Sequence, residues 1–201
     1  EILECPDFNN LAEKRNWILD KFGDAFMLDD DISAVERLYE SGLPYVLTPD
    51  EAADRIQRTY QQAKNIGVFL FGFNNDGTPA HYNAMKPFMM KGFINGCAIG
   101  IISGGGLRFT NKTVAAESHY INLLNAYRNR ACLIDKRFIY KQENGSTFLK
   151  DGGQTLNRTI ETEKRDSLFL RLMFGESVIL KKAKNATLQR NEYQRQLKIR
   201  L

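Results

Sequence analysis

Residues 25–32 read Ala-Phe-Met-Leu-Asp-Asp-Asp-Ile, and this stretch decides the fold. Its four apolar residues, Ala25–Leu28, predict a buried β-strand whose carboxyl end opens onto solvent. The three acids that follow repel one another, so folding alone gives no reason to place them together. Asp oxygens are hard ligands that suit Mg²⁺ or Mn²⁺, and open α/β sheets bind ligands at the carboxyl ends of their strands. The stretch therefore predicts an α/β fold with a metal and phosphate site.

A charged loop is the alternative interpretation of the three acids. The sequence predicts a short helix over residues 33–40, ended by Gly42, and either Asp31 or Ser33 could cap its first turn. In that case the acids would be solvated and would hold no metal.

The flanking segments predict helices that alternate with strands. Residues 9–22 favour a helix that an asparagine caps and Gly23 ends. The sequence Thr48-Pro-Asp-Glu51 is a capping box with proline at the first helical position, and its helix should run to about Lys64. Further strands are expected at 67–73, 92–102, 107–110, 132–134 and 137–141, and further helices at 114–127 and 159–174.

The charge is distributed unevenly along the chain. Residues 1–107 carry 9 Lys and Arg against 15 Asp and Glu, a net charge of −6, whereas residues 108–201 carry 19 against 9, a net charge of +10. The length predicts a single domain. Its basic half suggests a polyanionic partner such as nucleic acid, and a solvated basic helix face is the alternative.

The composition is that of a soluble globular domain, with 43% hydrophobic and 26% charged residues. No apolar run approaches the roughly 20 residues of a membrane span, so no membrane association is expected. The three widely spaced cysteines, Cys5, Cys97 and Cys132, argue against a disulfide framework and predict a cytoplasmic protein. The lack of a Cys-x-x-Cys pair argues against a zinc site.

The order of these motifs resembles that of GT-A glycosyltransferases, and more narrowly that of the TET-associated glycosyltransferases of bacteriophages. The resemblance covers about residues 9–155. It is carried by the following motifs in chain order: Arg15-Asn16 in a helix, the strand that ends in Asp29-Asp-Asp31, Gly-Phe-Ile-Asn-Gly at 92–96, Gly106-Leu-Arg-Phe109, the acidic helix start at Glu117, and Gly152-Gly153.

The resemblance implies a GT-A-like mixed sheet flanked by helices, with a basic α+β C-terminal part. Residues 1–107 would form the donor and metal half, and residues 108–201 the acceptor half. The donor would be a nucleotide sugar such as a UDP-sugar, the cofactor Mn²⁺ or Mg²⁺, and the acceptor a hydroxylated base in phage DNA within the infected bacterial cytoplasm. A GT-A domain usually begins with a strand and a helix upstream of the Arg-Asn helix. Only a few residues precede that helix here, so part of the donor site is expected to be missing or elsewhere.

The resemblance also implies roles for the acids. Asp29 and Asp31 would hold the metal, and alternation along an extended strand end puts both on the same side. Asp30 would lie close to the donor ribose or sugar. Glu117 would be the general base, with its pKa raised by partial burial. Relatives often have Glu-Asp where this chain has Glu117-Ser118.

The remaining implied contacts are with the donor. Arg15 and Asn16 would contact the nucleotide, with Arg15 facing the diphosphate. Asn95 and Gly96 would let the backbone approach the sugar. Gly152 and Gly153 would shape a phosphate-facing loop.

Each of these residues has an ordinary structural alternative. Arg15 could form a surface salt bridge with Glu13, and Glu117 could be a favourable first-turn acid. The two glycine motifs could be turns or bulges. His81 and His119 are expected to be surface or hydrogen-bonded histidines, and Cys97 a core residue.

Two other functions stay open on the sequence. One is a glycosyltransferase with a protein or glycan acceptor, in which the basic half binds no DNA. The other is a non-catalytic nucleic-acid-binding module that keeps the fold without a whole donor site.

Overall fold

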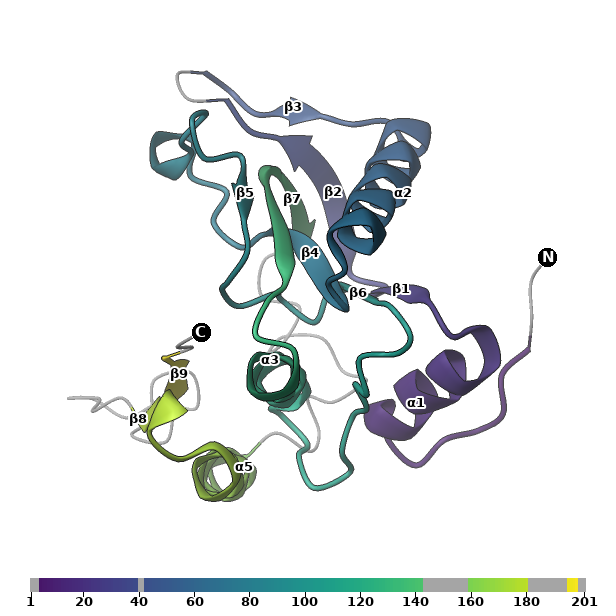
Figure 1. Cartoon of the computed structure of the whole chain (residues 1–201), viewed down its shortest axis with the longest axis vertical. Coiled ribbons are helices and arrows are strands. Elements are labelled where there is room, and N and C mark those ends of the chain that lie inside the picture. Colours follow the sequence, from purple (N-terminus) through teal and green to yellow (C-terminus); the bar gives the residue numbers. More distant parts are fainter. Residues whose placement is uncertain (1–3, 40–41, 143–158, 181–194, 199–201) are drawn as a thin grey trace.

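A mixed β-sheet with helices on both faces forms the centre of the molecule (Figure 1). The computed structural model describes residues 4–39, 42–142, 159–180 and 195–198. The strands follow the order β1 (Ala25–Leu28), β6 (Ala98–Ile101), β4 (Leu70–Asn74), β7 (Leu133–Gln142), β2 (Ile32–Arg37) and β3 (Tyr45–Val46), while β5 (Phe88–Met89) pairs with β7.

Four strands of this sheet, β1, β3, β4 and β7, run in the same direction, and β3 is one of them because β2 is antiparallel to both β3 and β7. β6 is antiparallel to both β1 and β4, so β1 and β4 are parallel to each other, and β7 is parallel to β4. The carboxyl ends of β1 and β4 therefore lie at one edge of the sheet. The expected mixed α/β sheet is confirmed.

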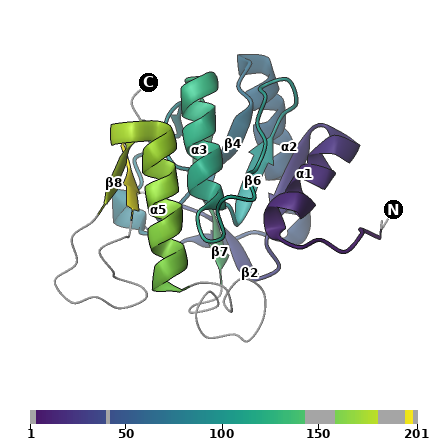
Figure 2. The same ribbon diagram turned by 90° about the horizontal axis from the view of Figure 1, so that it is seen from below.

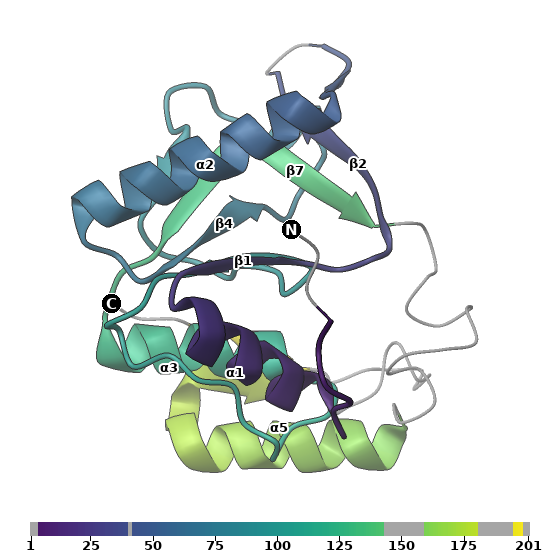
Figure 3. The same cartoon turned by 90° about the vertical axis from the view of Figure 1, so that its right-hand side faces the viewer.

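Helices cover the two faces of the sheet (Figure 3). α1 (Leu11–Phe22) and α3 (Glu117–Arg128) lie on one face, and α2 (Pro49–Ile66) lies on the other. The apolar core on the first face includes Leu19, Met27, Leu70, Ile99 and Ile121. The core on the second face includes Ala63 and Phe71. Among the described residues, no helix is both long enough and apolar enough to cross a bilayer.

The ends of α1 and α2 follow from their capping residues. Asn10 caps α1 by accepting the backbone N–H of Glu13, and Gly23 ends it. Thr48 and Glu51 form the expected capping box of α2, which has Pro49 in its first turn and ends at Gly67 in a left-handed conformation. Both helices are confirmed because their signals are local.

A helix and a two-stranded ribbon form the C-terminal part (Figure 2). α5 (Ile160–Phe174) packs on α3 through Leu170 and Leu123, and the 3₁₀ turn η3 (Gly175–Ser177) leads into β8 (Val178–Leu180), which pairs with β9 (Arg195–Leu197). The helix expected at 159–174 is confirmed, with Thr159 as its N-cap.

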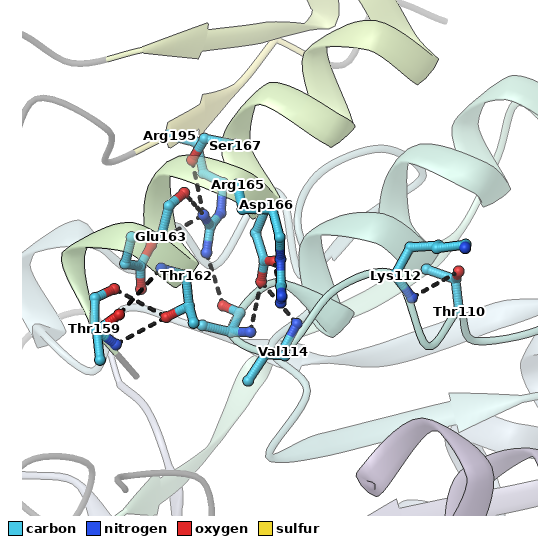
Figure 4. A network of polar contacts seen from close by, with 11 residues as sticks. Thr110, Lys112, Val114, Thr159, Thr162, Glu163, Arg165, Asp166, Ser167 and Arg195 are labelled. Atoms are coloured by element: carbon cyan, nitrogen blue, oxygen red, sulfur yellow. Dashed lines mark hydrogen bonds and ion pairs between the residues drawn. The ribbon is translucent and has the colours of Figure 1, made fainter. Parts of the chain in front are cut away.

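Buried charges join this C-terminal part to the segment before α3 (Figure 4). The Arg195 guanidinium lies 2.9 Å from a Glu163 carboxylate oxygen and donates to Ser167 Oγ at 2.8 Å and to the Ala115 carbonyl at 2.7 Å. Asp166 accepts the backbone N–H groups of Val114 and Ala115 at 2.8 and 2.7 Å. These contacts tie α5 and β9 to the residues that lead into α3.

The helix predicted for residues 33–40 is wrong, because the segment 32–37 forms strand β2. It pairs with the long strand β7 and also with β3. Ile32 and Val35 pack on the core, and Ser33 donates its hydroxyl to the Lys141 carbonyl instead of capping a helix. Pairing with β7 thus overrides the helical preference of the segment.

Three smaller expectations also need correction. The strand predicted at 107–110 is an extended segment outside the sheet, and α3 begins at Glu117 rather than at residue 114. The strands expected at 132–134 and 137–141 are one strand, β7. Between β4 and β6 the chain also forms the 3₁₀ turn η1 (Pro79–His81) and β5.

An aromatic ring fills the space next to Gly100, the glycine of β6. A Cβ at Gly100 would overlap the Phe71 ring, which is 1% exposed and cannot move away. We expect Gly100→Ala to lower the free energy of unfolding by about 1–3 kcal/mol, as for other overpacked cores. Urea denaturation checks this result. Gly42→Ala is the control, since no atom lies within 4 Å of the position that its Cβ would take; equal effects of the two changes would contradict the packing.

Asp24 makes the stability of the fold depend on pH. Burial raises the pKa of Asp24, but hydrogen bonds from Ser103, Tyr60 and Lys64 outweigh it and hold the pKa well below its usual value. A lowered folded-state pKa adds stability above the unfolded-state pKa of about 3.9, and this stability is lost as the pH falls through the folded-state pKa. We expect Asp24→Asn to lower the free energy of unfolding at pH 7 and to differ progressively less from the wild type below about pH 4. Urea denaturation between neutral and acid pH measures both curves, and a constant difference at every pH would contradict the assignment.

Candidate functional site

The acidic loop Asp29–Asp31 crosses the carboxyl edge of the sheet. It joins β1 to β2, and β6, β4 and β7 lie between these two strands (Figure 3). Asp29 donates its backbone N–H to the Cys97 carbonyl at 2.9 Å. Asp29 and Asp31 are half-buried while Asp30 is exposed, but Asp30 and Asp31 form a turn, so the expected extension of the strand through the acids is wrong. The loop therefore lies against the start of β6, at the edge of the sheet where β1 and β4 end.

Arg15 of α1 reaches this loop from the face of the sheet that α1 and α3 cover. Its Nη2 donates to Asp29 Oδ1 at 3.2 Å and to the Gly96 carbonyl at 3.0 Å, and its guanidinium lies 5.2 Å from the centre of the Phe109 ring. Arg15 is 5% exposed. The surface salt bridge with Glu13, offered as its alternative role, is wrong, because Glu13 instead accepts hydrogen bonds from Asn9 and Asn10.

The neighbouring Asn16 has a structural contact. Its side-chain amide donates to the Phe109 carbonyl at 3.0 Å and accepts the Phe109 N–H at 2.9 Å. These two bonds replace the ladder that a strand partner would supply, and they hold the extended segment 107–110 against α1.

Gly96 meets the first turn of α3. A Cβ at Gly96 would lie 3.0 Å from Ser118 Cβ and 3.4 Å from Arg15 Nη1, so the close approach of these groups favours glycine at this position. Glu117, the residue before Ser118, is the first residue of α3 and is 8% exposed. The structure therefore brings Asp29, Arg15, Gly96 and the start of α3 together.

The charge of Asp29 is disfavoured by its surroundings. Burial raises the pKa of Asp29, the Arg15 guanidinium lowers it, and the charges of Asp31 and Asp30 raise it further, so the net shift is upward. Burial, followed by the charges of Asp29 and Asp31, raises the pKa of the Cys97 thiol to about 12. Cys97 is thus a protonated core residue, as expected, and not a nucleophile.

The acids fit one way in which proteins bind Mg²⁺. Asp31 accepts two hydrogen bonds from the Gln142 amide, at 3.1 and 3.0 Å, and Asp29 is paired with Arg15. Within the described ranges, no group of three His, Cys, Asp or Glu residues could hold a metal ion. Mg²⁺ often uses only one or two carboxylates together with waters and substrate phosphates. Asp29 and Asp31 fit such a site, in which Arg15 and Gln142 would share the carboxylates.

A small pocket lies at the carboxyl end of β4. It is lined by Phe73, Asn74, Asn75, Asn95, Cys97, Ala98, Ile139 and Tyr140, and its volume of about 40 Å³ suits a few water molecules or one small polar group. Asn95, expected at the donor site, is therefore found here. Asn74 and Asn75 were not predicted as site residues, because Asn-Asn-Asp-Gly after a strand is an ordinary turn signal.

The remaining candidates are the two histidines and the Gly152-Gly153 motif. His81 is exposed and its Nδ1 lies 2.7 Å from an Asp76 carboxylate oxygen, so the expectation of a surface or hydrogen-bonded histidine is confirmed for His81. The half-buried His119 ring packs with its centre 4.9 Å from that of the Phe93 ring. Gly152 and Gly153 lie outside the described residues.

The candidate site thus consists of the ends of the parallel strands, the acidic loop and the start of α3. Comparison of the chain with protein-family models, with curated proteins and with solved structures finds no match.

Proposed function

We propose that this protein is a metal-dependent glycosyltransferase with a GT-A-like fold. It would transfer a sugar from a nucleotide-sugar donor, such as a UDP-sugar, to a hydroxyl on a modified base in phage DNA. One observation carries the proposal: two half-buried acids follow β1 at the carboxyl edge of the sheet, beside a buried arginine and the acidic start of α3.

This arrangement supports the separation of roles that sugar transfer needs. Asp29 and Asp31 would hold Mn²⁺ or Mg²⁺, which would neutralise charge on the departing diphosphate. Arg15 is the nearest cation to Asp29, so it would turn to the diphosphate when a metal takes over the carboxylate. Asp30 is exposed on the same loop, where it could bond a ribose or sugar hydroxyl.

Glu117 would act on the acceptor. Its carboxylate would accept the proton of the acceptor hydroxyl while that oxygen bonds the sugar and the bond to the diphosphate breaks. Glu117 is the first residue of α3 and is 8% exposed. Gly96 packs against the next residue, Ser118, and thereby sets the distance between this helix and the donor loop.

The acceptor assignment rests on charge. Residues 108–201 carry a net charge of +10 and would contact the phosphate backbone of DNA. A base inside a duplex is inaccessible, so the acceptor base would have to leave the stack.

A transfer assay tests the proposal. The protein is incubated with a panel of nucleotide sugars and with hydroxymethylated or unmodified DNA, with and without Mn²⁺. Transfer only to hydroxymethylated DNA, and only with Mn²⁺, is the expected result. Transfer to a protein or glycan but not to DNA would keep the enzyme class and reject the acceptor. No turnover of any donor would reject the function.

A non-catalytic nucleic-acid-binding module is the second candidate. It is favoured by the small pocket and by the partners that Asp29 and Asp31 already have. Such a module would bind DNA with an affinity that falls steeply with salt, and it would give no metal-dependent heat with nucleoside diphosphates.

A further inference from the structure

A bulge in β7 directs a lysine across the end of β4. Phe73 of β4 is paired with Asp135, but the next residue, Asn74, is paired with Ile139, so three residues of β7 have no partner in β4. The backbone N–H of Lys136 is held by the Pro87 carbonyl at 2.8 Å, next to β5. Bulges are frequent beside functional sites, where they aim a side chain away from the regular ladder.

The ammonium group of Lys136 has an unusual set of partners. It donates to the side-chain oxygen of Asn74, which lines the pocket and is 5% exposed. In the described part of the chain, no carboxylate lies within 4.0 Å of this ammonium group. An ammonium group carries three donors and no acceptor. Lys136 is thus a half-buried cation held by a neutral amide.

The surrounding charges do not neutralise Lys136. Asp76 is close enough to raise the pKa of Lys136, but its carboxylate accepts the Thr78 N–H at 2.9 Å and lies 2.7 Å from His81 Nδ1. Arg137, the next residue, is paired with Asp135. Burial dominates, and it lowers the pKa of Lys136.

Amide groups lie around the same pocket. The Asn95 side-chain oxygen is 3.5 Å from the Cys97 N–H, while its NH₂ group has no acceptor in the described residues and is exposed. Asn75 positions this residue by accepting the Asn95 backbone N–H at 3.3 Å. Asn74 and Asn95 thus line a pocket of about 40 Å³, a size that takes one small group, and Lys136 reaches the edge of this pocket through its hydrogen bond to Asn74.

We propose that Lys136 and Asn95 form a subsite for an oxyanion, a phosphate group, at the carboxyl end of β4. The phosphate would accept from the ammonium and from the amide, and it would supply the negative charge that the half-buried cation lacks. The phosphate could belong to a free nucleotide or to a nucleic-acid backbone. The subsite does not depend on sugar transfer, so it can exist in a transferase or in a binding module.

Side-chain NMR of Lys136 tests this subsite without any assay of activity. The metal-free protein is titrated separately with inorganic phosphate, with UDP and with a short single-stranded oligonucleotide. We expect saturable shifts of the Lys136 side-chain resonances and a rise of its pKa in at least one titration. A response to UDP but not to the oligonucleotide identifies a nucleotide phosphate, and the reverse identifies the nucleic-acid backbone.

Lys136→Met removes the charge and keeps the apolar stem. It should weaken binding of the responding ligand by about tenfold or more, as for loss of a charge-assisted hydrogen bond. Lys86→Met is the matched control and should leave binding unchanged, because Lys86 is an exposed lysine next to Pro87, the residue whose carbonyl accepts the Lys136 N–H. Unmoved Lys136 resonances with all three ligands would overturn the subsite, and equal losses in the two variants would do the same. If Lys136→Met does not fold, the wild-type titrations decide alone.

Discussion

Asp29→Ala is expected to reduce metal-dependent sugar transfer by roughly a thousandfold, which corresponds to about 4 kcal/mol of transition-state stabilisation. Charge stabilisation by a bound metal is worth several kcal/mol in such reactions. The change removes a proposed metal ligand and leaves the buried Arg15 without the Asp29 carboxylate. Steady-state rates with saturating donor and Mn²⁺ measure the loss.

Two further variants separate chemistry from folding. Asp29→Asn keeps an oxygen that can accept from Arg15 but removes the charge, so it should stay folded and lose most of the activity. Asp20→Ala is the control, because Asp20 forms only an exposed pair with Arg108, with side chains 65% and 52% exposed. An Asp29→Asn enzyme as active as the Asp20→Ala enzyme would show that the charge of Asp29 has no part in transfer.

Arg195→Met is expected to cause the largest loss of stability, about 3–5 kcal/mol, because it leaves a buried carboxylate without its cation. The side chains of Arg195 and Glu163 are only 3% and 4% exposed. The same guanidinium also bonds Ser167 and the Ala115 carbonyl (Figure 4). Urea denaturation followed by circular dichroism gives the free energy of unfolding.

Arg165→Met is the matched control on α5. Arg165 pairs with Asp166, but its side chain is 56% exposed, so the pair should contribute at most about 1 kcal/mol. Equal losses in the free energy of unfolding of the two methionine variants would contradict this account. They would show that burial does not determine how much the contacts of Arg195 stabilise the fold.

Local signals allowed much of the fold to be predicted from the sequence. The asparagine before α1, the capping box of α2 and the threonine before α5 each lie within a few residues of the helix they start. The apolar run before the three acids likewise predicts β1 correctly. Signals of this kind depend on neighbouring residues alone.

Long-range pairing explains what the sequence did not predict. β2 was expected to be a helix because its pairing partner, β7, lies about a hundred residues away, as in the pair of Glu36 with Ile139. The contact of Arg15 with the Gly96 carbonyl joins residues 81 positions apart. Arg195 reaches Ala115 across 80 positions. No pattern within one segment reports such contacts.

The candidate site was predicted in its position more than in its contacts. The acids do lie at the carboxyl edge of the sheet, and Arg15 and Gly96 do lie beside them. No motif indicated that Gln142 would hold Asp31 or that Asn16 would bind the Phe109 backbone. Amide partners of this kind depend on the register of β7 and on the path of the segment 107–110.

Calorimetric titration of UDP into the protein, with and without Mn²⁺, tests the central claim that the acidic loop holds a divalent cation against a phosphate. We expect binding that requires Mn²⁺ in the wild type and is absent when both Asp29 and Asp31 are changed to Asn. Binding of UDP that is equally strong with and without Mn²⁺, or that survives the double change, would contradict a metal site on this loop.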